Sequence, residues 1–220
     1  MHSNQPAFRL FLFALGLALL AASCSSAYYG VMEKFGHAKR EILVDRVEEG
    51  RNAQQDAKKE FQSALDAFKS VTGFSGGDLE ALYTRLNGNY QDCSESVDTV
   101  KERIESIETV AGVMFSEWKQ EIGEIHSPDL RAKSESMRKD TQRQYGELIA
   151  AMKRAESKME PVLVDFKDRV LFLKHNLNAN AIASLKGDLG AIEGNVGALI
   201  KDMEASIAEA DRFISSMAQS

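Results

Sequence analysis

The sequence predicts an all-α protein, an elongated antiparallel four-helix bundle or coiled-coil rod. Apolar residues recur at alternating spacings of three and four over most of the chain, which is the period of a helix with one buried face. The chain is rich in helix-favouring residues, and only three of its 220 residues are proline. Breaks rich in Gly, Pro or Asn divide the pattern into four segments.

The N-terminus carries a candidate targeting segment, residues 1–23. Arg9 supplies a positive charge, and residues 10–22 form an apolar run too short to span a bilayer comfortably as a helix. Residues 20–24 (LAASC) resemble the lipobox of bacterial lipoproteins, in which the signal peptidase cuts before the cysteine and the thiol receives a diacylglycerol. The run departs from the usual pattern at Ala21, where Leu is more common. The alternative is an ordinary secretory peptide followed by a chance cysteine.

Acylation of Cys24 would anchor the mature chain, residues 24–220, to a membrane. Each acyl methylene removed from water contributes roughly 0.8 kcal/mol, so several chains on one cysteine hold a protein stably. In Gram-negative lipoproteins, Asp after the cysteine tends to retain the protein at the inner membrane, whereas Ser25 resembles the outer-membrane pattern. We therefore expect a lipid-anchored protein on the outer membrane that faces the periplasm.

The first helix is expected over residues 28–71. Both of its ends carry apolar residues at helical spacing, whereas between residues 48 and 60 only Ala53 and Ala57 could face a core. That middle stretch is either a thin, close-packed waist or a solvated, mobile one.

The second helix is expected over residues 78–126, after a Gly-rich break. Asp78 is a good N-cap candidate. The apolar stripe includes Cys93 and Trp118, so we expect Trp118 in the core rather than at a partner surface. If Cys24 is acylated, Cys93 is the remaining thiol and is either buried or bridged between chains, and its place on the stripe favours burial.

The third helix is expected over residues 128–176, with Ser127 as N-cap and Pro128 at the first position, where a missing N–H costs no hydrogen bond. Pro161 lies inside this segment, but the stripe keeps its phase, so we expect a kink rather than an end. The stripe comprises Leu130, Met137, Tyr145, Leu148, Met152, Ala155, Met159, Val162, Phe166, Val170, Leu173 and Leu177. The fourth helix is expected over residues 180–217.

The break before the fourth helix is visible only as a slip in phase. The stripe steps five residues from Leu177 to Ile182, which a continuous helix would not make without rotating its buried face. The Asn residues between them tolerate left-handed backbone and cap helices well. We therefore predict a tight turn, and three reversals would place Ser220 at the same end of the bundle as Cys24.

No active-site motif is recognisable in the sequence. The four histidines form no pair with metal-ligand spacing, and no phosphate loop, nucleophile elbow or Cys-x-x-Cys occurs. We therefore expect no catalytic, cofactor-binding or metal site, which leaves Cys24 as the predicted functional residue. The formal charge of −6, without a basic run, argues against nucleic acid as a partner.

Residues 32–47 (MEKFGHAKREILVDRV) and 171–185 (LFLKHNLNANAIASL) resemble a proteobacterial family of helical envelope proteins known as a domain of unknown function. The resemblance implies a fold and a compartment for nearly all of the mature chain, and it implies no activity. Both stretches are rich in polar groups, which could form a partner site or a charge network that holds the helix ends. These groups are Lys39, Arg40, Asp45, Arg46, Lys174, His175 and Asn176.

Together these features predict a non-enzymatic structural or adaptor lipoprotein of the cell envelope. It would bind another envelope protein through helix-to-helix contacts and could form a homo-oligomer. The alternative is a lipid-contacting or membrane-remodelling helical rod. Removal of residues 1–23 takes away one basic residue, Arg9, and no acidic one, so the net charge becomes −7. That charge argues against binding to anionic lipid unless a local basic face survives.

Overall fold

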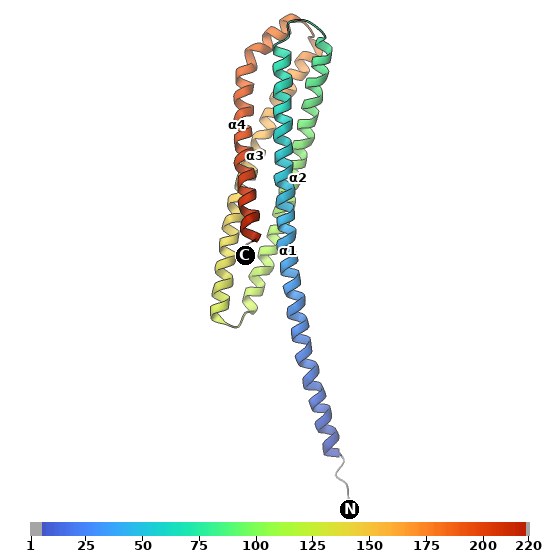
Figure 1. Ribbon diagram of the computed structural model, residues 1–220, viewed down its shortest axis with the longest axis vertical. Coiled ribbons are helices and arrows are strands. Elements are labelled where there is room, and N and C mark those ends of the chain that lie inside the picture. Colours follow the sequence, from blue (N-terminus) through green and yellow to red (C-terminus); the bar gives the residue numbers. More distant parts are fainter. Residues whose placement is uncertain (1–5, 219–220) are drawn as a thin grey trace, which may run out of the picture. The chain divides into compact units, whose positions relative to one another are not determined.

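The computed structural model describes the backbone of residues 6–218 and the side chains of residues 39–218. The chain divides into two units, residues 1–41 and 42–220, which we describe separately. Its helices are α1 (Pro6–Thr72), α2 (Leu79–Glu124), α3 (Pro128–His175) and α4 (Ala179–Ala218), and no strand occurs between residues 6 and 218 (Figure 1). The prediction of an all-α, four-helix bundle is confirmed.

The first helix is longer than the sequence pattern indicates. The backbone of α1 is helical from Pro6, and its helix therefore includes the apolar run at residues 10–22. The expected first helix began near residue 28. The removal of residues 1–23 stays a prediction.

Side-chain caps begin α2 and α3 where the sequence predicts. Asp78 accepts a hydrogen bond from the backbone N–H of Ala81 at 3.0 Å. Ser127 accepts one from the N–H of Leu130 at 3.5 Å, and Pro128 occupies the first turn of α3. These side chains satisfy backbone donors that have no partner inside the helix.

The loop between α1 and α2 and the loop between α3 and α4 both contain residues suited to tight turns. Gly76 and Gly77 adopt φ angles of 143° and 116°, which residues with a Cβ rarely reach. Asn178 accepts hydrogen bonds from the N–H groups of Asn180 and Ala181, both at 3.0 Å. The predicted turn between the third and fourth helices is therefore present, and the Asn178 side chain caps α4.

Helix α3 continues through Pro161, as the unbroken phase of its apolar stripe predicts. Its 48 residues correspond to a length of about 70 Å at 1.5 Å per residue. Residues 42–220 thus form an elongated bundle (Figure 1).

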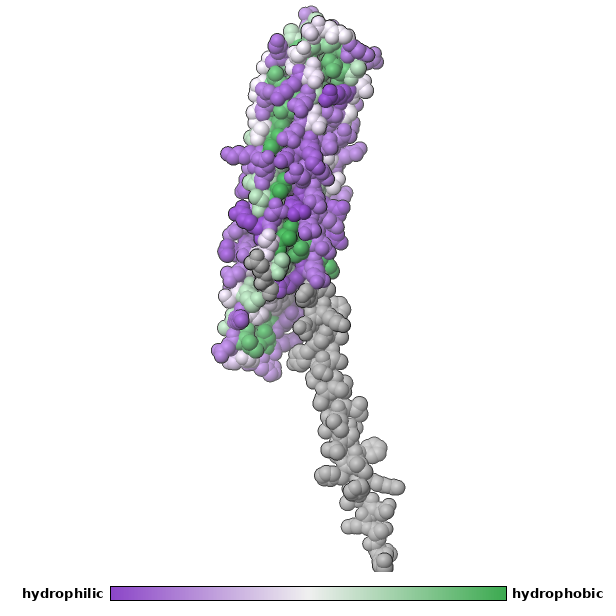
Figure 2. Space-filling model, in the orientation of Figure 1, coloured by the Kyte–Doolittle hydropathy of each residue, from purple (hydrophilic) through white to green (hydrophobic). Residues whose placement is uncertain are grey.

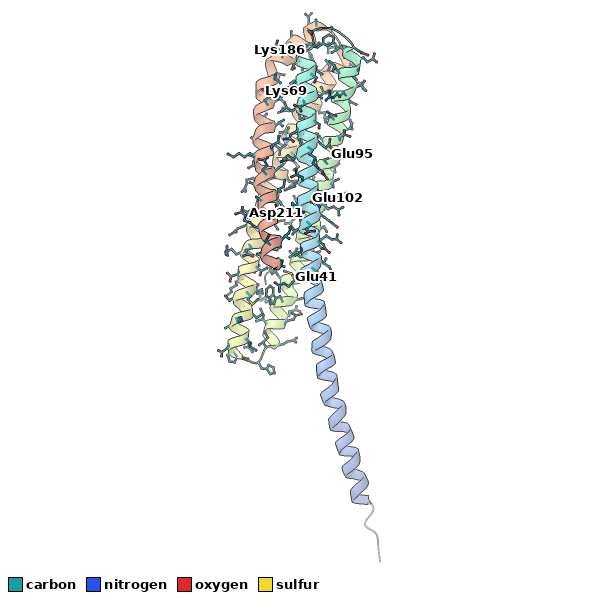
Figure 3. All side chains as sticks on the ribbon, in the orientation of Figure 1. Glu41, Lys69, Glu95, Glu102, Lys186 and Asp211 are labelled. Carbon is teal, nitrogen blue, oxygen red and sulfur yellow. The ribbon has the colours of Figure 1, made fainter. Side chains whose placement is uncertain are left out.

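Ion pairs on the bundle surface show that α1 and α4 run antiparallel. Arg51 pairs with Asp211 at 2.8 Å, and Lys69 pairs with Glu193 at 3.0 Å. Residue numbers therefore rise along α1 as they fall along α4. Figure 3 shows Lys69 and Asp211 on these two helices. Such exposed pairs contribute little stability, about 0–1 kcal/mol each, so the buried core holds the bundle together.

The core runs along the bundle and draws on all four helices. Its continuity follows from stripes that keep the three-and-four spacing. The largest fully buried side chains are Phe61, Phe68, Phe166, Leu43, Leu86, Ile107, Leu148, Met152, Met159, Leu173, Ile192 and Leu199.

The stretch between residues 48 and 60 is the close-packed waist, not a solvated segment. Gly50 is buried, and a Cβ added there would lie 2.8 Å from Ile107 Cδ1 and 3.3 Å from Met152 Cε. One turn later, Gln54 is fully buried and donates a hydrogen bond from Nε2 to the Met152 carbonyl at 3.3 Å. The absence of a side chain at Gly50 therefore lets α1 approach α2 and α3 closely.

Three members of the predicted stripe of the third helix are wrong. Leu130 is 60% exposed, Met137 37% and Leu177 41%. Leu177 lies in the loop after α3 ends at His175. Leu130 and Met137 are exposed because the α2–α3 hairpin extends past the end of α4, as Figure 1 shows, so that α4 does not cover them.

Candidate functional site

The predicted lipidation residue, Cys24, lies in the part of α1 whose side chains the structure does not describe. Its acylation therefore stays a prediction. In the described part of the chain, no helix is both long enough and apolar enough to cross a membrane.

The charged residues near the start of the bundle take part in a network between helices. Arg46 donates to both carboxylate oxygens of Glu49 on the same helix, at 2.7 and 2.8 Å. Glu49 also accepts from Arg103 of α2 at 2.9 Å. This network joins α1 to α2, which supports the structural interpretation of Arg46. Lys39 and Arg40 belong to the unit formed by residues 1–41.

Most polar side chains of the turn at residues 174–178 cap the end of α3 or the start of α4. Asn176 donates from its side chain to the Phe172 carbonyl at 2.9 Å, which satisfies a free acceptor near the end of α3. Asn178 caps α4, as described above. Lys174 and His175 are exposed in the last turn of α3, where positive charge interacts favourably with the helix dipole.

The histidines with described side chains do not meet. His126 lies in the turn before α3, and His175 is the last residue of α3, so the helix separates them. Between residues 39 and 218, no group of three or more His, Cys, Asp or Glu side chains is placed to hold a metal ion.

An acidic groove of about 330 Å³ lies between α1 and α2. Its lining residues are Ala53, Asp56, Glu60, Asp92, Glu95, Ser96 and Thr99. Lys59 pairs with Asp56 at 2.8 Å and offsets part of the negative charge. The Thr99 hydroxyl is committed to the backbone carbonyl of Glu95 at 2.9 Å. The groove is thus a solvated space between charged helix faces, and it has no buried polar group aimed into it to hold a ligand.

Cys93 lies beneath this side of α2 and is fully buried. Burial, followed by the nearby carboxylates of Glu60 and Asp92, raises the pKa of its thiol to about 12. The thiol is therefore protonated at neutral pH and unreactive as a nucleophile. Its burial confirms the core interpretation over a bridge between chains.

One feature suited to an interaction is the end of the α2–α3 hairpin, residues 113–145, which we call the hairpin end. A second group of exposed large apolar residues lies toward the other end of α3 and in the turn after it: Val164, Leu171, Phe172 and Leu177. The Ser216 hydroxyl donates to Gln144 Oε1 at 2.9 Å, which fixes the level at which α4 stops, since α4 ends at Ala218. Beyond this level, α2 and α3 continue to their turn without α4.

Aromatic and polar contacts hold α2 against α3 in the hairpin end. The Trp118 indole donates to the Ser134 hydroxyl at 3.1 Å. The rings of Phe115 and Tyr145 lie 5.6 Å apart at 59°, a favourable tilted arrangement. Burial, and then the charge of Glu108, raise the pKa of Tyr145 to about 12, so its phenol stays neutral.

Polar residues occupy positions on α3 where an apolar stripe would be expected. Thr141 is buried and donates to the Met137 carbonyl at 3.0 Å. The Arg138 guanidinium donates hydrogen bonds to both carboxylate oxygens of Glu135, at 2.9 and 3.1 Å. This hydrogen-bonded pair lowers the pKa of Glu135 from 4.5 to about 2. Thr141, Arg138 and Glu135 thus form their hydrogen bonds within α3.

Apolar side chains remain on the outside of the hairpin end. Leu130 and Met137 on α3 and Val113 on α2 are exposed, although each is large and apolar. Figure 2 shows a largely hydrophilic surface with apolar patches along the bundle and near both of its ends, one of them where α2 and α3 meet. Exposed apolar groups rimmed by polar ones are typical of interaction surfaces.

The sequence contains the signal for this surface, but its meaning depends on the fold. Leu130 and Met137 are seven residues apart and were correctly predicted to share one face of a helix. The polar residues Ser134 and Thr141 alternate with them and occupy the side of α3 that packs against α2, which is the signal that the apolar residues lie outside this contact. Only the position of α4's end shows that the face is uncovered.

Residues 28–217 match a family of proteins of unknown function (DUF2959), and the chain belongs to this family. The match covers most of the bundle and agrees with the resemblance noted in the sequence. No match to a curated protein is found.

Proposed function

We propose that this member of the DUF2959 family is a non-enzymatic structural or adaptor lipoprotein of the cell envelope. An acylated Cys24 would anchor it to the outer membrane, and the helical bundle would face the periplasm. The hairpin end would be its docking surface for helix-to-helix contacts.

The observation that carries this proposal is the exposed apolar stripe on the hairpin end. Leu130 and Met137 share one face of α3, and this part of α3 is held against α2 by the contacts of Trp118 with Ser134 and of Phe115 with Tyr145. A rigid helix face with regularly spaced apolar groups needs little reorganisation to bind another helix. The anchor is supported by the resemblance of residues 20–24 to a lipobox.

A fractionation experiment tests the anchor. Replacing Cys24 by Ser removes the acylated thiol, and we expect the variant to leave the membrane fraction for the soluble periplasm. A Cys93→Ser variant is the matched control and should stay with the membrane, because Cys93 is buried in the bundle. Retention of the Cys24→Ser variant on outer membranes after a high-salt wash would contradict the anchor.

A site-specific cross-linking experiment tests the docking surface. A photoreactive amino acid at Met137 should form adducts in intact envelopes. The same group at Leu171, which is 46% exposed on the same helix but far from the hairpin end, should form fewer. Equal adduct formation at both positions would mean that the hairpin end has no special contact.

Contact with lipid is the second candidate, favoured by the charge of the α3 segment of the hairpin end, although the hairpin end as a whole holds six basic and six acidic residues. Residues 129–143 contain five basic and three acidic residues, although the chain as a whole carries −6. A local basic surface attracts anionic lipid in proportion to its charge. Vesicles with and without phosphatidylglycerol, mixed with the Cys24→Ser protein, test this candidate, since salt-sensitive binding only to the anionic vesicles would support it.

A further inference from the structure

The side of α3 that packs against α4 continues beyond the end of α4. Gln144 contacts Ser216 near the end of α4, and Met137 and Leu130 lie seven and fourteen residues before Gln144. Seven residues correspond closely to two helical turns, so all three share this side of α3. The hairpin end therefore presents the surface that a further helix would cover.

We propose that a second copy of this chain covers this surface, with α3 of each copy packed antiparallel against α3 of the other. The inference rests on the proposed role of the hairpin end and names its partner. The contact stripe consists of Leu130, Lys133, Met137 and Asp140, whose spacings alternate between three and four.

The charges of the stripe complement one another only in an antiparallel pair. Lys133 lies four residues before Met137, and Asp140 lies three residues after it. When two stripes cross near Met137, each Lys133 faces the partner subunit's Asp140, and the apolar residues lie between the two ion pairs. A parallel pair would instead place like charges opposite each other.

Neither charge has an ion-pair partner elsewhere among residues 39–218. Lys133 and Asp140 cannot pair within one helix, because seven residues separate them by about 10 Å. The nearby basic groups Arg138 and Arg143 are already paired with carboxylates of α3 itself. Lys133 and Asp140 are thus the charges available to a second copy.

An anionic membrane fits this stripe less well than a second copy does. Asp140 lies inside the stripe, and Glu121 and Glu124 lie on the neighbouring end of α2. These carboxylates would repel anionic headgroups, whereas an antiparallel copy supplies Lys133 opposite Asp140.

Charge exchange tests the pairing in the full-length protein, purified in mild detergent and studied by sedimentation velocity over a range of concentrations. Lys133→Asp and Asp140→Lys each place like charges in contact, and we expect each to weaken self-association about tenfold. Combining the two exchanges restores opposite charges and should return the dissociation constant to within about threefold of the original. A concentration-independent monomer, or no rescue in the double variant, would overturn the inference.

Disulfide formation locates the contact independently of affinity. Met137→Cys places a thiol near the two-fold axis, and mild oxidation should link two copies through it. Leu171→Cys is the matched control on the same helix and should link far less. Dimers linked equally through both positions would overturn the proposed geometry.

The two proposals fail in different ways. A monomer that still forms adducts from position 137 to a different envelope protein would overturn the second copy but leave the docking surface intact. A monomer with no adducts at position 137 would overturn both. Met137 replaced by Gln should keep the melting temperature of the bundle, so a loss of self-association in that variant supports the inference without involving misfolding.

Discussion

The bundle and the hairpin end are built from the same helices but are held together differently. In the bundle, α2 and α3 bury large apolar side chains such as Ile107 and Phe166 against the other helices. In the hairpin end, α2 and α3 meet through Trp118 and Ser134, and Leu130 stays exposed. The same two helices therefore belong to a four-helix core in the bundle and to a smaller two-helix contact in the hairpin end, where Met114, Phe115 and Ile122 are still buried.

Where a neighbouring helix ends decides whether an apolar stripe is buried or exposed. Where α4 runs beside α3, the three-and-four pattern is buried, as at Met152 and Met159. Past Ala218, similar spacing at Leu130 and Met137 is left uncovered. An apolar side chain contributes stability only when a neighbour removes it from water, so these two residues are free to serve binding instead.

The largest effect is expected from a charge placed in the bundle core. Ile192 is 1% exposed, so Ile192→Asp would bury an unpaired carboxylate and lower the free energy of unfolding by about 4 kcal/mol or more. Leu189→Asp, three residues earlier and only partly buried, should cost markedly less. Thermal melts followed by circular dichroism compare the two, and equal melting temperatures would show that α4 does not bury this face as described.

A smaller effect is expected from filling the waist. Gly50→Leu forces a side chain against Ile107 and Met152 and should destabilise the bundle by about 1–3 kcal/mol. Gly50→Ala is the control. The ends of Ile107 and Met152 can move aside, and alanine favours a helix by about 1 kcal/mol over glycine, so this variant should stay close to the original. Denaturant midpoints measure the stability of both variants. If Gly50→Leu left the midpoint unchanged, α1 would not be tightly packed at this position.

Gln54→Met should stabilise the bundle by roughly 1 kcal/mol. The Gln54 side chain is fully buried, and its Oε1 has no hydrogen-bond partner among the described residues. Methionine has a similar length and removes this unsatisfied acceptor. A rise in the urea midpoint would agree with this account, and a clear fall would show that the amide makes hydrogen bonds that outweigh its burial.

The smallest effect is expected in the hairpin end, as a dependence of local stability on pH. The pKa of Glu135 is lowered from 4.5 to about 2 by its hydrogen bonds with Arg138. A lowered pKa in the folded state gives a contribution that is present above about pH 4.5 and is lost as the pH falls toward 2. The protection of the backbone amides of residues 130–142 against hydrogen exchange, taken relative to their intrinsic rates at each pH, should therefore fall over this window, and Glu135→Gln should remove that dependence. An unchanged pH profile in the variant would argue against the pair.

The fold was largely predictable from sequence because its signals are local. Asp78 and Ser127 cap helices through their own side chains, and the phase slip after Leu177 marks a real turn. The close approach at Gly50 and the burial of Gln54 were not predicted, because they depend on which helix lies opposite.

The candidate site was less predictable for the same reason. Leu130 and Met137 were correctly placed on one face, but their exposure depends on where α4 ends relative to α3. A single helical stripe has the same spacing whether a neighbour covers it or not. The functional residue that the sequence predicts, Cys24, lies outside the described side chains.

We expect the hairpin end to be covered by a partner in the envelope. Thiol labelling of Met137→Cys and Leu171→Cys tests it most directly, in intact envelopes and in dilute purified protein. We expect position 137 to react at least about tenfold more slowly in envelopes than in dilution, because a covered thiol reacts only in its open fraction. Position 171 should react at similar rates in both. Equal rates at position 137 under the two conditions would contradict the claim.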